Sequence, residues 1–119
     1  MSDPIYKILT HDEWASLQAA GRFDGAPVDI ADGYVHFSTA SQVRETAAKH
    51  FAGKNDLHLL AVAPEQLGDA LNWEPSRGGA LFPHLYAPLS MDAVIWEKPL
   101  PLDDDGRHVF PEDLAGATA

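Results

Sequence analysis

The chain contains no cysteine, so it can form neither a disulfide framework nor a thiolate zinc site, and it has no thiol nucleophile. Its longest apolar run, over 57–63, is interrupted by His58 and is far too short to cross a bilayer. Residues 1–7 lack the basic and apolar regions of a signal peptide. We therefore expect a cytoplasmic protein.

Basic residues are also scarce: 8 lysines and arginines stand against 18 acidic residues, which gives a net charge of −10. Such a charge repels phosphate backbones and anionic lipid surfaces. We expect a small-molecule ligand, and neither duplex nucleic acid nor a membrane as a partner. The charge also simply favours solubility, and a local basic pocket around Arg22 or Arg77 remains open for a small anion.

The length of 119 residues and the hydrophobic content of 45% are typical of one globular domain that folds without covalent cross-links. We expect a single domain over 1–119, with a frayed tail over 111–119. The oligomeric state is not encoded in any pattern, and a monomer is the default.

Two helices are predicted in the N-terminal half. The first begins after Thr10, where Thr10 and Glu13 form a capping box, and ends at Gly21. The second follows a strand over 34–38, begins after Thr39 with a second capping box, and runs towards Gly53. The intervening segment 21–33 is rich in glycine and aspartate without periodicity, which predicts an exposed loop that serves either as a binding loop or as plain surface.

The remainder is predicted to be mostly strand. A buried strand over 57–63 precedes a helical turn over 64–68, and further strands are expected over 71–74, 82–86, 93–97 and 107–110, with turns over 76–79 and 103–106. This order predicts an α+β domain with a mainly antiparallel sheet that is curved or split.

His36 is the first candidate for chemistry, because it lies on the strand face opposite Val35 and Phe37 and its imidazole titrates near neutral pH. Ser38 and Thr39 follow where a helix begins, at a place that favours polar or anionic ligands. The structural alternatives are a histidine hydrogen-bonded to a neighbouring strand and a threonine that only caps its helix.

Two further groups are candidates. His84 and Tyr86 share a strand face with Phe82, which combines a stacking surface with two polar tips, although an aromatic face packed under a loop fits equally well. Glu74 follows Trp73, whose ring is expected to raise the carboxyl pKa and suit it to acid–base or cation-stabilising chemistry.

Some polar residues rank lower. Glu97, which follows Trp96, is a weaker version of the same pattern. His36, Glu74 and His84 together are also a possible two-histidine, one-carboxylate metal set, but no local metal-binding motif is present and no metal is expected. We treat the other histidines as structural or exposed: His11, His50, His58 and His108.

The strings Asp32-Gly-Tyr-Val-His-Phe-Ser-Thr39 and Phe82-Pro-His-Leu-Tyr86, together with Trp14, Gln42 and Trp73-Glu74, resemble bacterial domain-of-unknown-function family 952. The resemblance covers nearly the whole chain up to about Phe110. This family itself looks like a distant relative of the ADP-ribosyltransferase superfamily.

That second resemblance implies NAD as a substrate, bound in a cleft between two small antiparallel sheets. Residues 34–50 would correspond to the superfamily's strand–helix element, with His36 or Tyr34 at the ring-stacking position and Glu74 stabilising the ribosyl cation. The sequence departs from the superfamily on its first strand, where Tyr6 and Lys7 stand in place of a ribose-gripping histidine or arginine; His84 is our conjectured replacement.

The leading hypothesis is therefore an NAD-binding, ADP-ribosyltransferase-like domain. Its catalytic residues would be Glu74 and His36, and its NAD-binding residues would be Tyr34, His36, Ser38, Thr39, His84 and Tyr86. The first alternative is a non-catalytic module that binds a nucleotide or small metabolite in the same cleft. The second is a metal-dependent hydrolase that uses His36, His84 and Glu74.

Overall fold

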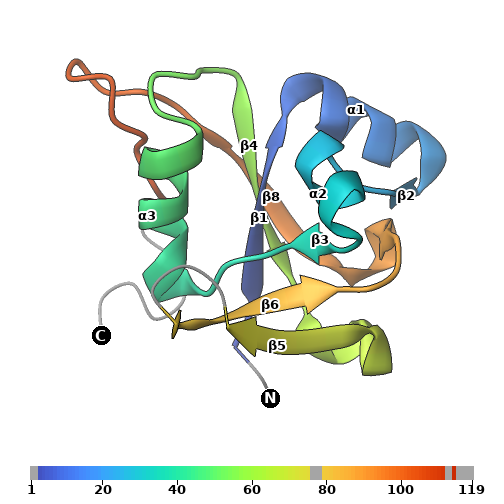
Figure 1. Cartoon of the computed structure of the whole chain (residues 1–119). Coiled ribbons are helices and arrows are strands. Elements are labelled where there is room, and N and C mark those ends of the chain that lie inside the picture. Colours follow the sequence, from blue (N-terminus) through green and yellow to red (C-terminus); the bar gives the residue numbers. More distant parts are fainter. Residues whose placement is uncertain (1–2, 76–78, 112–113, 115–119) are drawn as a thin grey trace.

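The computed structural model describes residues 3–75, 79–111 and 114, and its strands form three antiparallel sheets (Figure 1). The first sheet has the order β1 (Ile5–Thr10), β4 (Leu57–Val62), β8 (Val94–Leu100). The second has the order β3 (Val35–His36), β6 (Leu81–Leu85), β5 (Leu71–Pro75). A small ribbon pairs β2 (Arg22–Phe23) with β7 (Leu89–Ser90). The predicted α+β class with mainly antiparallel pairing is confirmed, and the strands are divided between two three-stranded sheets and the small ribbon.

Three α-helices accompany the sheets: α1 (His11–Ala20), α2 (Pro27–Asp32) and α3 (Ala40–His50). The described residues also include the 3₁₀ turns η1 (Pro64–Gln66), η2 (Gly68–Ala70) and η4 (Met91–Ala93). None of these helices within the described ranges has the length and apolar character needed to cross a bilayer.

The start and end of α1 agree with the prediction. The backbone N–H of Thr10 donates to Glu13 Oε1 at 2.9 Å, and the Glu13 N–H donates to Thr10 Oγ1 at 3.2 Å, so each side chain satisfies an orphan donor of the first turn. Gly21 ends the helix in the left-handed region at φ 77°, which glycine adopts without a Cβ clash.

The first sheet is covered on both faces, because alternate residues of its strands point to opposite sides. Ile5, Leu9 and Leu60 pack with Trp14 and Leu17 of α1 in one cluster. Tyr6, Ile8 and Leu59 pack with Val43 and Ala47 of α3 in the other. The two longer helices therefore lie on opposite faces of this sheet, on either side of β1 (Figure 1).

The prediction of an exposed loop over 21–33 was wrong. The segment contains β2 and the short helix α2, and Asp29 within it is only 1% exposed. Pro27 opens α2, and Asp29 at its third position accepts the Ala26 backbone N–H at 2.8 Å. This helix is held by a buried polar residue instead of an apolar stripe, so hydrophobic periodicity does not reveal it.

Smaller differences concern element ends. α3 stops at His50, before the predicted Gly53, and the strand predicted over 107–110 is only an isolated bridge between Leu102 and His108. The turn predicted over 76–79 falls mainly outside the described residues. So does the frayed tail predicted over 111–119, although Leu114 is described and is buried.

Candidate functional site

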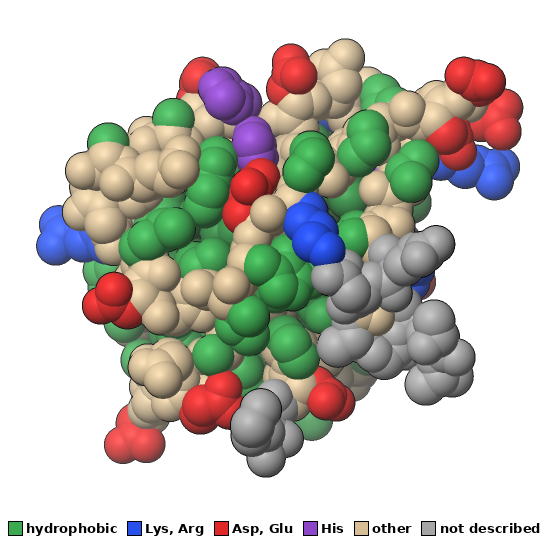
Figure 2. Space-filling model, turned by 180° about the vertical axis from the view of Figure 1, so that it is seen from behind, with side chains coloured by type: hydrophobic (Ala, Val, Ile, Leu, Met, Phe, Trp, Pro, Cys, Tyr) green, Lys and Arg blue, Asp and Glu red, His purple; other side chains and the backbone are tan. Residues whose placement is uncertain are grey.

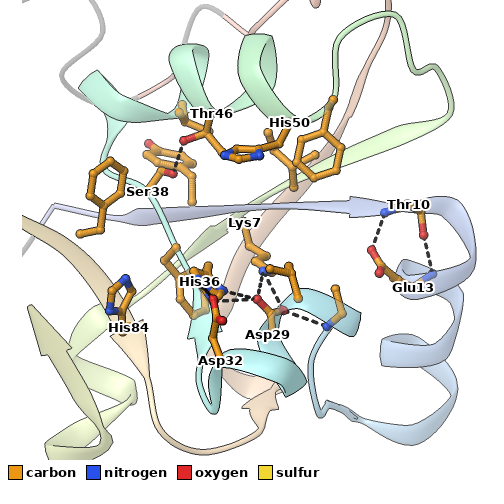
Figure 3. Close-up of a pocket in the computed structure, with 18 of the residues that line it drawn as sticks. Lys7, Thr10, Glu13, Asp29, Asp32, His36, Ser38, Thr46, His50 and His84 are labelled. Atoms are coloured by element: carbon orange, nitrogen blue, oxygen red, sulfur yellow. Dashed lines mark hydrogen bonds and ion pairs between the residues drawn. The ribbon is translucent and has the colours of Figure 1, made fainter. Parts of the chain in front are cut away.

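A cleft of about 660 Å³ opens between the two larger sheets. Figure 3 shows β1 passing through it, α3 on one side, and α2 with β3 on the other. Tyr6, Lys7 and Ile8 of β1, His36 of β3 and His84 of β6 are among its lining residues. This volume lies within the range typical of small-molecule sites.

Asp29 of α2 lines the cleft and contacts residues of three other segments. Its carboxylate accepts two contacts from Lys7 Nζ, at 3.0 and 3.2 Å, and a further hydrogen bond from the backbone N–H of His36 at 3.1 Å. Together with the bond from Ala26, these contacts join β1, β3 and the start of α2 through one side chain. Lys7 is also buried, at 8% exposed.

Burial would raise the pKa of Asp29, but the hydrogen bond from His36, the charge of Lys7 and the Ala26 N–H more than compensate and lower it to about 2. Burial lowers the pKa of Lys7, and the attraction of Asp29 opposes this. The pair is therefore a buried ion pair whose two charges depend on one another.

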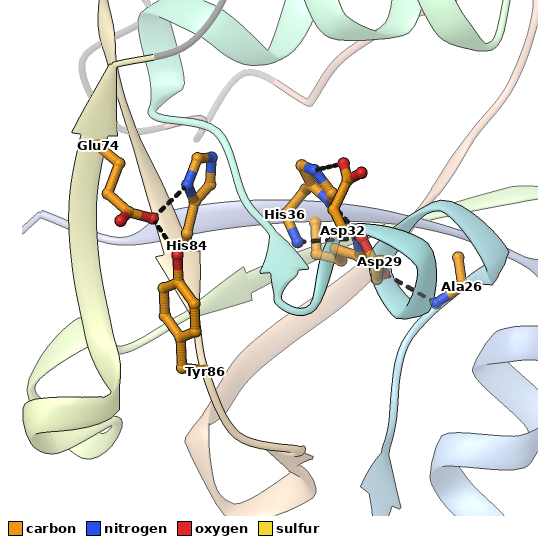
Figure 4. A network of polar contacts seen from close by, with 8 residues as sticks. Ala26, Asp29, Asp32, His36, Glu74, His84 and Tyr86 are labelled. Atoms are coloured by element: carbon orange, nitrogen blue, oxygen red, sulfur yellow. Dashed lines mark hydrogen bonds and ion pairs between the residues drawn. The ribbon is translucent and has the colours of Figure 1, made fainter.

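His36 lies between two carboxylates. Its Nδ1 is 2.5 Å from Asp29 Oδ1, and its Nε2 is 3.0 Å from Asp32 Oδ2 (Figure 4). Only an imidazolium carries a proton on both ring nitrogens, so donation to both carboxylates at once requires the charged form. The side chain is 31% exposed, and it lines the cleft.

His84 is held by a second network (Figure 4). Its Nδ1 lies 2.9 Å from Glu74 Oε1, which also accepts the Tyr86 hydroxyl at 2.7 Å. A carboxylate at Nδ1 favours the tautomer that carries the proton there and leaves a lone pair on Nε2. Among the described residues, Nε2 has no hydrogen-bond partner, although the ring is only 2% exposed and lines the cleft.

The prediction that Trp73 raises the Glu74 pKa was wrong. Trp73 and Glu74 are successive residues of β5, so their side chains point to opposite faces, and Trp73 is 46% exposed. Hydrogen bonds from Tyr86 and then His84 lower the pKa of Glu74. The same bond to Glu74 is the main cause that raises the pKa of Tyr86 to about 12.

Tyr34 connects the two networks. Its ring stacks on His84 at 4.1 Å between centroids with an interplanar angle of 24°, and it lies 4.7 Å from His36 and 5.2 Å from Tyr86. Burial is the main cause that raises its pKa, followed by the charges of Asp32 and Glu74. Four of the six residues predicted to bind NAD therefore lie against one another: Tyr34, His36, His84 and Tyr86.

The predicted residues do not all line the cleft. His36, Ser38 and His84 do, and the Ser38 hydroxyl lies 2.9 Å from Thr46 Oγ1 of α3. Tyr34 and Tyr86 line a smaller hollow of about 370 Å³ elsewhere against α2. Glu74 and Thr39 line neither the cleft nor the smaller hollow. The Thr39 N–H donates to Gln42 Oε1 at 3.0 Å, in the predicted capping box.

Sequence reasoning missed Asp29, Asp32, His50 and Lys54, all of which line the cleft. The signal for Asp29 was present as Ala26-Pro-Val-Asp29, a proline at the first position of a helix with an acidic residue two places later. Nothing in the sequence marked His50 and Lys54, which reach the cleft from the end of α3 and the turn beyond it.

The predicted metal set is not assembled. His36 is paired with Asp29 and Asp32, whereas His84 is paired with Glu74. Within the described part of the chain, no group of three or more histidine or acidic residues is arranged to hold a metal ion.

The molecule is a small α+β protein with a histidine-lined cleft between two antiparallel sheets. Residues 8–97 match the family described as "Protein of unknown function (DUF952)", and the chain belongs to that family. The family prediction made from the two motif strings is therefore confirmed. No curated protein matches the chain.

Solved structures of one protein, CC0527 from Caulobacter crescentus, are similar along almost the whole chain. Its crystal structure is 54% identical with a TM-score of 0.86, and the match covers 89% of this chain and 93% of that one. Its solution NMR structure is 55% identical with a TM-score of 0.79, over 87% and 90% of the two chains. These similarities identify the fold of this family and do not assign an activity.

Proposed function

We propose that the cleft binds NAD and that the protein is an ADP-ribosyltransferase-like enzyme. The observation that carries this proposal is the Nε2 of His84, which has no hydrogen-bond partner in the described part of the chain and sits on a buried ring that lines a cavity of about 660 Å³. A buried polar group without a partner costs free energy, so a ligand that hydrogen-bonds to it is favoured.

The charges along the cleft support a ligand with a cationic and an anionic part. Asp32 lies on the side of α2, whereas His50 lies on the side of α3 (Figure 3). Lys54, four residues after His50, also lines the cleft. NAD combines a positively charged nicotinamide ring with a negatively charged pyrophosphate. The nicotinamide end would lie near Asp32, whose carboxylate is oriented by His36, and the pyrophosphate towards His50 and Lys54.

The chemistry would be cleavage of the bond between nicotinamide and ribose. The bonding electrons leave with nicotinamide, and a positive charge develops on the ribose, where the half-exposed Asp32 carboxylate is placed to stabilise it. The acceptor forms the new bond to the ribose and transfers its proton to His84 Nε2. Glu74 acts as a positioning residue, because it contacts His84 and lies outside the cavity lining.

The first experiment is a titration of the metal-free protein with NAD, monitored by calorimetry and by NMR. The His36→Ala variant is titrated in parallel. The His11→Ala variant is the matched control, since His11 is an exposed histidine outside the cleft lining. The proposal predicts saturable binding that His36→Ala loses and His11→Ala keeps. No binding at millimolar NAD would contradict it.

Turnover is tested by measuring nicotinamide release from NAD. Glu74→Gln should bind NAD with little change and lower the rate of release, because the amide still accepts a hydrogen bond but no longer balances a charge on His84. Full activity in this variant would remove the role of Glu74.

A non-catalytic binding module is the second candidate. The observation in its favour is that Glu74, the carboxylate expected to face the ribose, does not line the cleft. Saturable binding of NAD or another nucleotide without nicotinamide release would select this function.

A further inference from the structure

A second group of histidines lies outside the cleft, where α1 begins beside β4. His11 is the first residue of α1, and His58 is the second residue of β4. Their Nδ1 and Nε2 atoms, respectively, are 3.1 Å apart. His11 is exposed and His58 is 17% exposed, so the pair is open to solvent on the side of His11.

His58 is oriented from two sides. Its Nδ1 is 2.5 Å from Glu97 Oε2 of β8, and its ring stacks on Trp14 with 5.9 Å between centroids and an interplanar angle of 27°. The carboxylate fixes the proton on Nδ1 and leaves the lone pair on Nε2, on the side of His11. Metal-binding histidines usually donate one ring N–H to a carboxylate in this way, which directs the lone pair of the other nitrogen; in His58 that lone pair now accepts the hydrogen bond from His11.

We propose that His11 and His58 form a site for a divalent transition-metal ion of the zinc class. His58 would bind through Nε2, and His11 would bind through Nδ1 after its ring proton moves to its own Nε2. The two nitrogens face each other, 3.1 Å apart with ring centroids 5.3 Å apart, so the exposed His11 ring would have to turn before both lone pairs point at one ion. At this nitrogen separation and about 2.05 Å from each nitrogen to zinc, the angle at the metal would be about 98°. Water would occupy the remaining positions.

The surroundings of the pair favour a cation. Asp12, Asn55 and Asp56 line a shallow hollow together with His11, and no lysine or arginine lines it. These side chains can accept hydrogen bonds from metal-bound water. The partial positive charge at the start of α1 acts in the opposite direction and limits the affinity.

Figure 2 shows the face opposite to that of Figure 1, on which apolar side chains are interspersed with polar and acidic ones and histidine side chains lie next to an acidic side chain. The residues of the proposed site are identified from their contacts. This site is independent of the proposed NAD cleft, because neither His58 nor Glu97 lines that cleft. The residues that carry it come from α1, β4 and β8, so it forms only in the folded chain.

The test is a titration of the metal-free, full-length protein with zinc chloride, monitored by calorimetry and by NMR of the histidine ring nitrogens. We expect one saturable site, with shifts at His11 Nδ1 and His58 Nε2. The exposed substitution His11→Ala should weaken zinc binding at least tenfold without disturbing the fold. Glu97→Gln should weaken it about 10- to 100-fold, as loss of a carboxylate partner does at other histidine ligands.

His36→Ala is the matched control, because its histidine also contacts a carboxylate but lies in the cleft. It should leave zinc binding unchanged. Wild-type affinity in His11→Ala, or loss of binding in His36→Ala, would overturn the proposal. Neither result bears on NAD binding. The NAD titration uses the same two variants, but there His36→Ala is expected to lose binding and His11→Ala to keep it.

Discussion

Replacing Asp29 by asparagine nearly preserves the shape of this side chain and removes its charge. Asparagine can still accept one or two of the hydrogen bonds that Asp29 receives from Ala26, His36 and Lys7, but the buried ammonium of Lys7 loses its counter-charge. Breaking a buried ion pair by removing one partner costs about 3–5 kcal/mol. The substitution is therefore expected to destabilise the fold strongly.

The pKa of Asp29 gives a second route to the magnitude. Lowering this pKa from 3.8 to about 2 on folding corresponds to about 2 kcal/mol of stability at neutral pH. This figure counts only the preference for the charged carboxylate and omits the strain of an unpaired lysine. We therefore expect Asp29→Asn to lower the free energy of unfolding by about 3 kcal/mol at pH 7.

The assay is urea denaturation at pH 7 followed by tryptophan fluorescence. Asp24→Asn is the matched control, since Asp24 pairs with Arg22 at 3.5 Å and both side chains are more than 60% exposed; it should change stability by less than about 0.5 kcal/mol. Adding Lys7→Met to Asp29→Asn should recover stability, because it removes the uncompensated charge. A loss below about 1 kcal/mol in Asp29→Asn, or additive losses in the double variant, would refute this reasoning.

Three further predictions concern Asp29 at low pH, the hydrogen bond between Tyr86 and Glu74, and the close approach of Gly25 to Asp29. The pKa of Asp29 is lower in the folded than in the unfolded chain, so its contribution to stability is present above pH 3.8 and is lost as the pH falls towards about 2. The urea midpoint should therefore decline less steeply between pH 6 and pH 2 in Asp29→Asn than in the wild type. Tyr86→Phe removes the largest cause of the lowered Glu74 pKa, so carboxyl NMR titration should show that pKa rise, and an unchanged value would exclude the hydrogen bond. Gly25→Ala should lower the midpoint of thermal unfolding more than Gly68→Ala does. Both glycines have positive φ, at 129° and 62°, but of the two only a Cβ at Gly25 would meet Asp29 Cβ, at 2.9 Å. Equal losses in the two variants would contradict the predicted clash.

Features set by neighbouring residues were predictable from the sequence. The capping boxes at Thr10 and Thr39 place the starts of two helices, because the bonding atoms are three residues apart. Strand alternation likewise placed His84 and Tyr86 on one face, where both contact Glu74.

Features that depend on distant partners were not predictable. Asp29 is separated from Lys7 by 22 residues, and nothing near either position marks the other. Glu74 illustrates the converse error. Its neighbour in sequence, Trp73, points to the opposite face of β5, whereas His84 and Tyr86, 10 and 12 residues away, donate the hydrogen bonds that lower its pKa. Side-chain chemistry follows contacts across the sheet rather than adjacency along the chain.

The junction between the two larger sheets has a consequence for motion. Among the described residues, β1 meets the chain after β3 in an isolated bridge, in which Tyr6 and Ser38 exchange backbone hydrogen bonds of 2.7 and 2.9 Å. Both residues line the cleft. Separation of the sheets would break these two bonds and leave the ladders within each sheet intact, so deuterium exchange at the amides of Tyr6 and Ser38 would report the fraction of molecules in which the cleft is open.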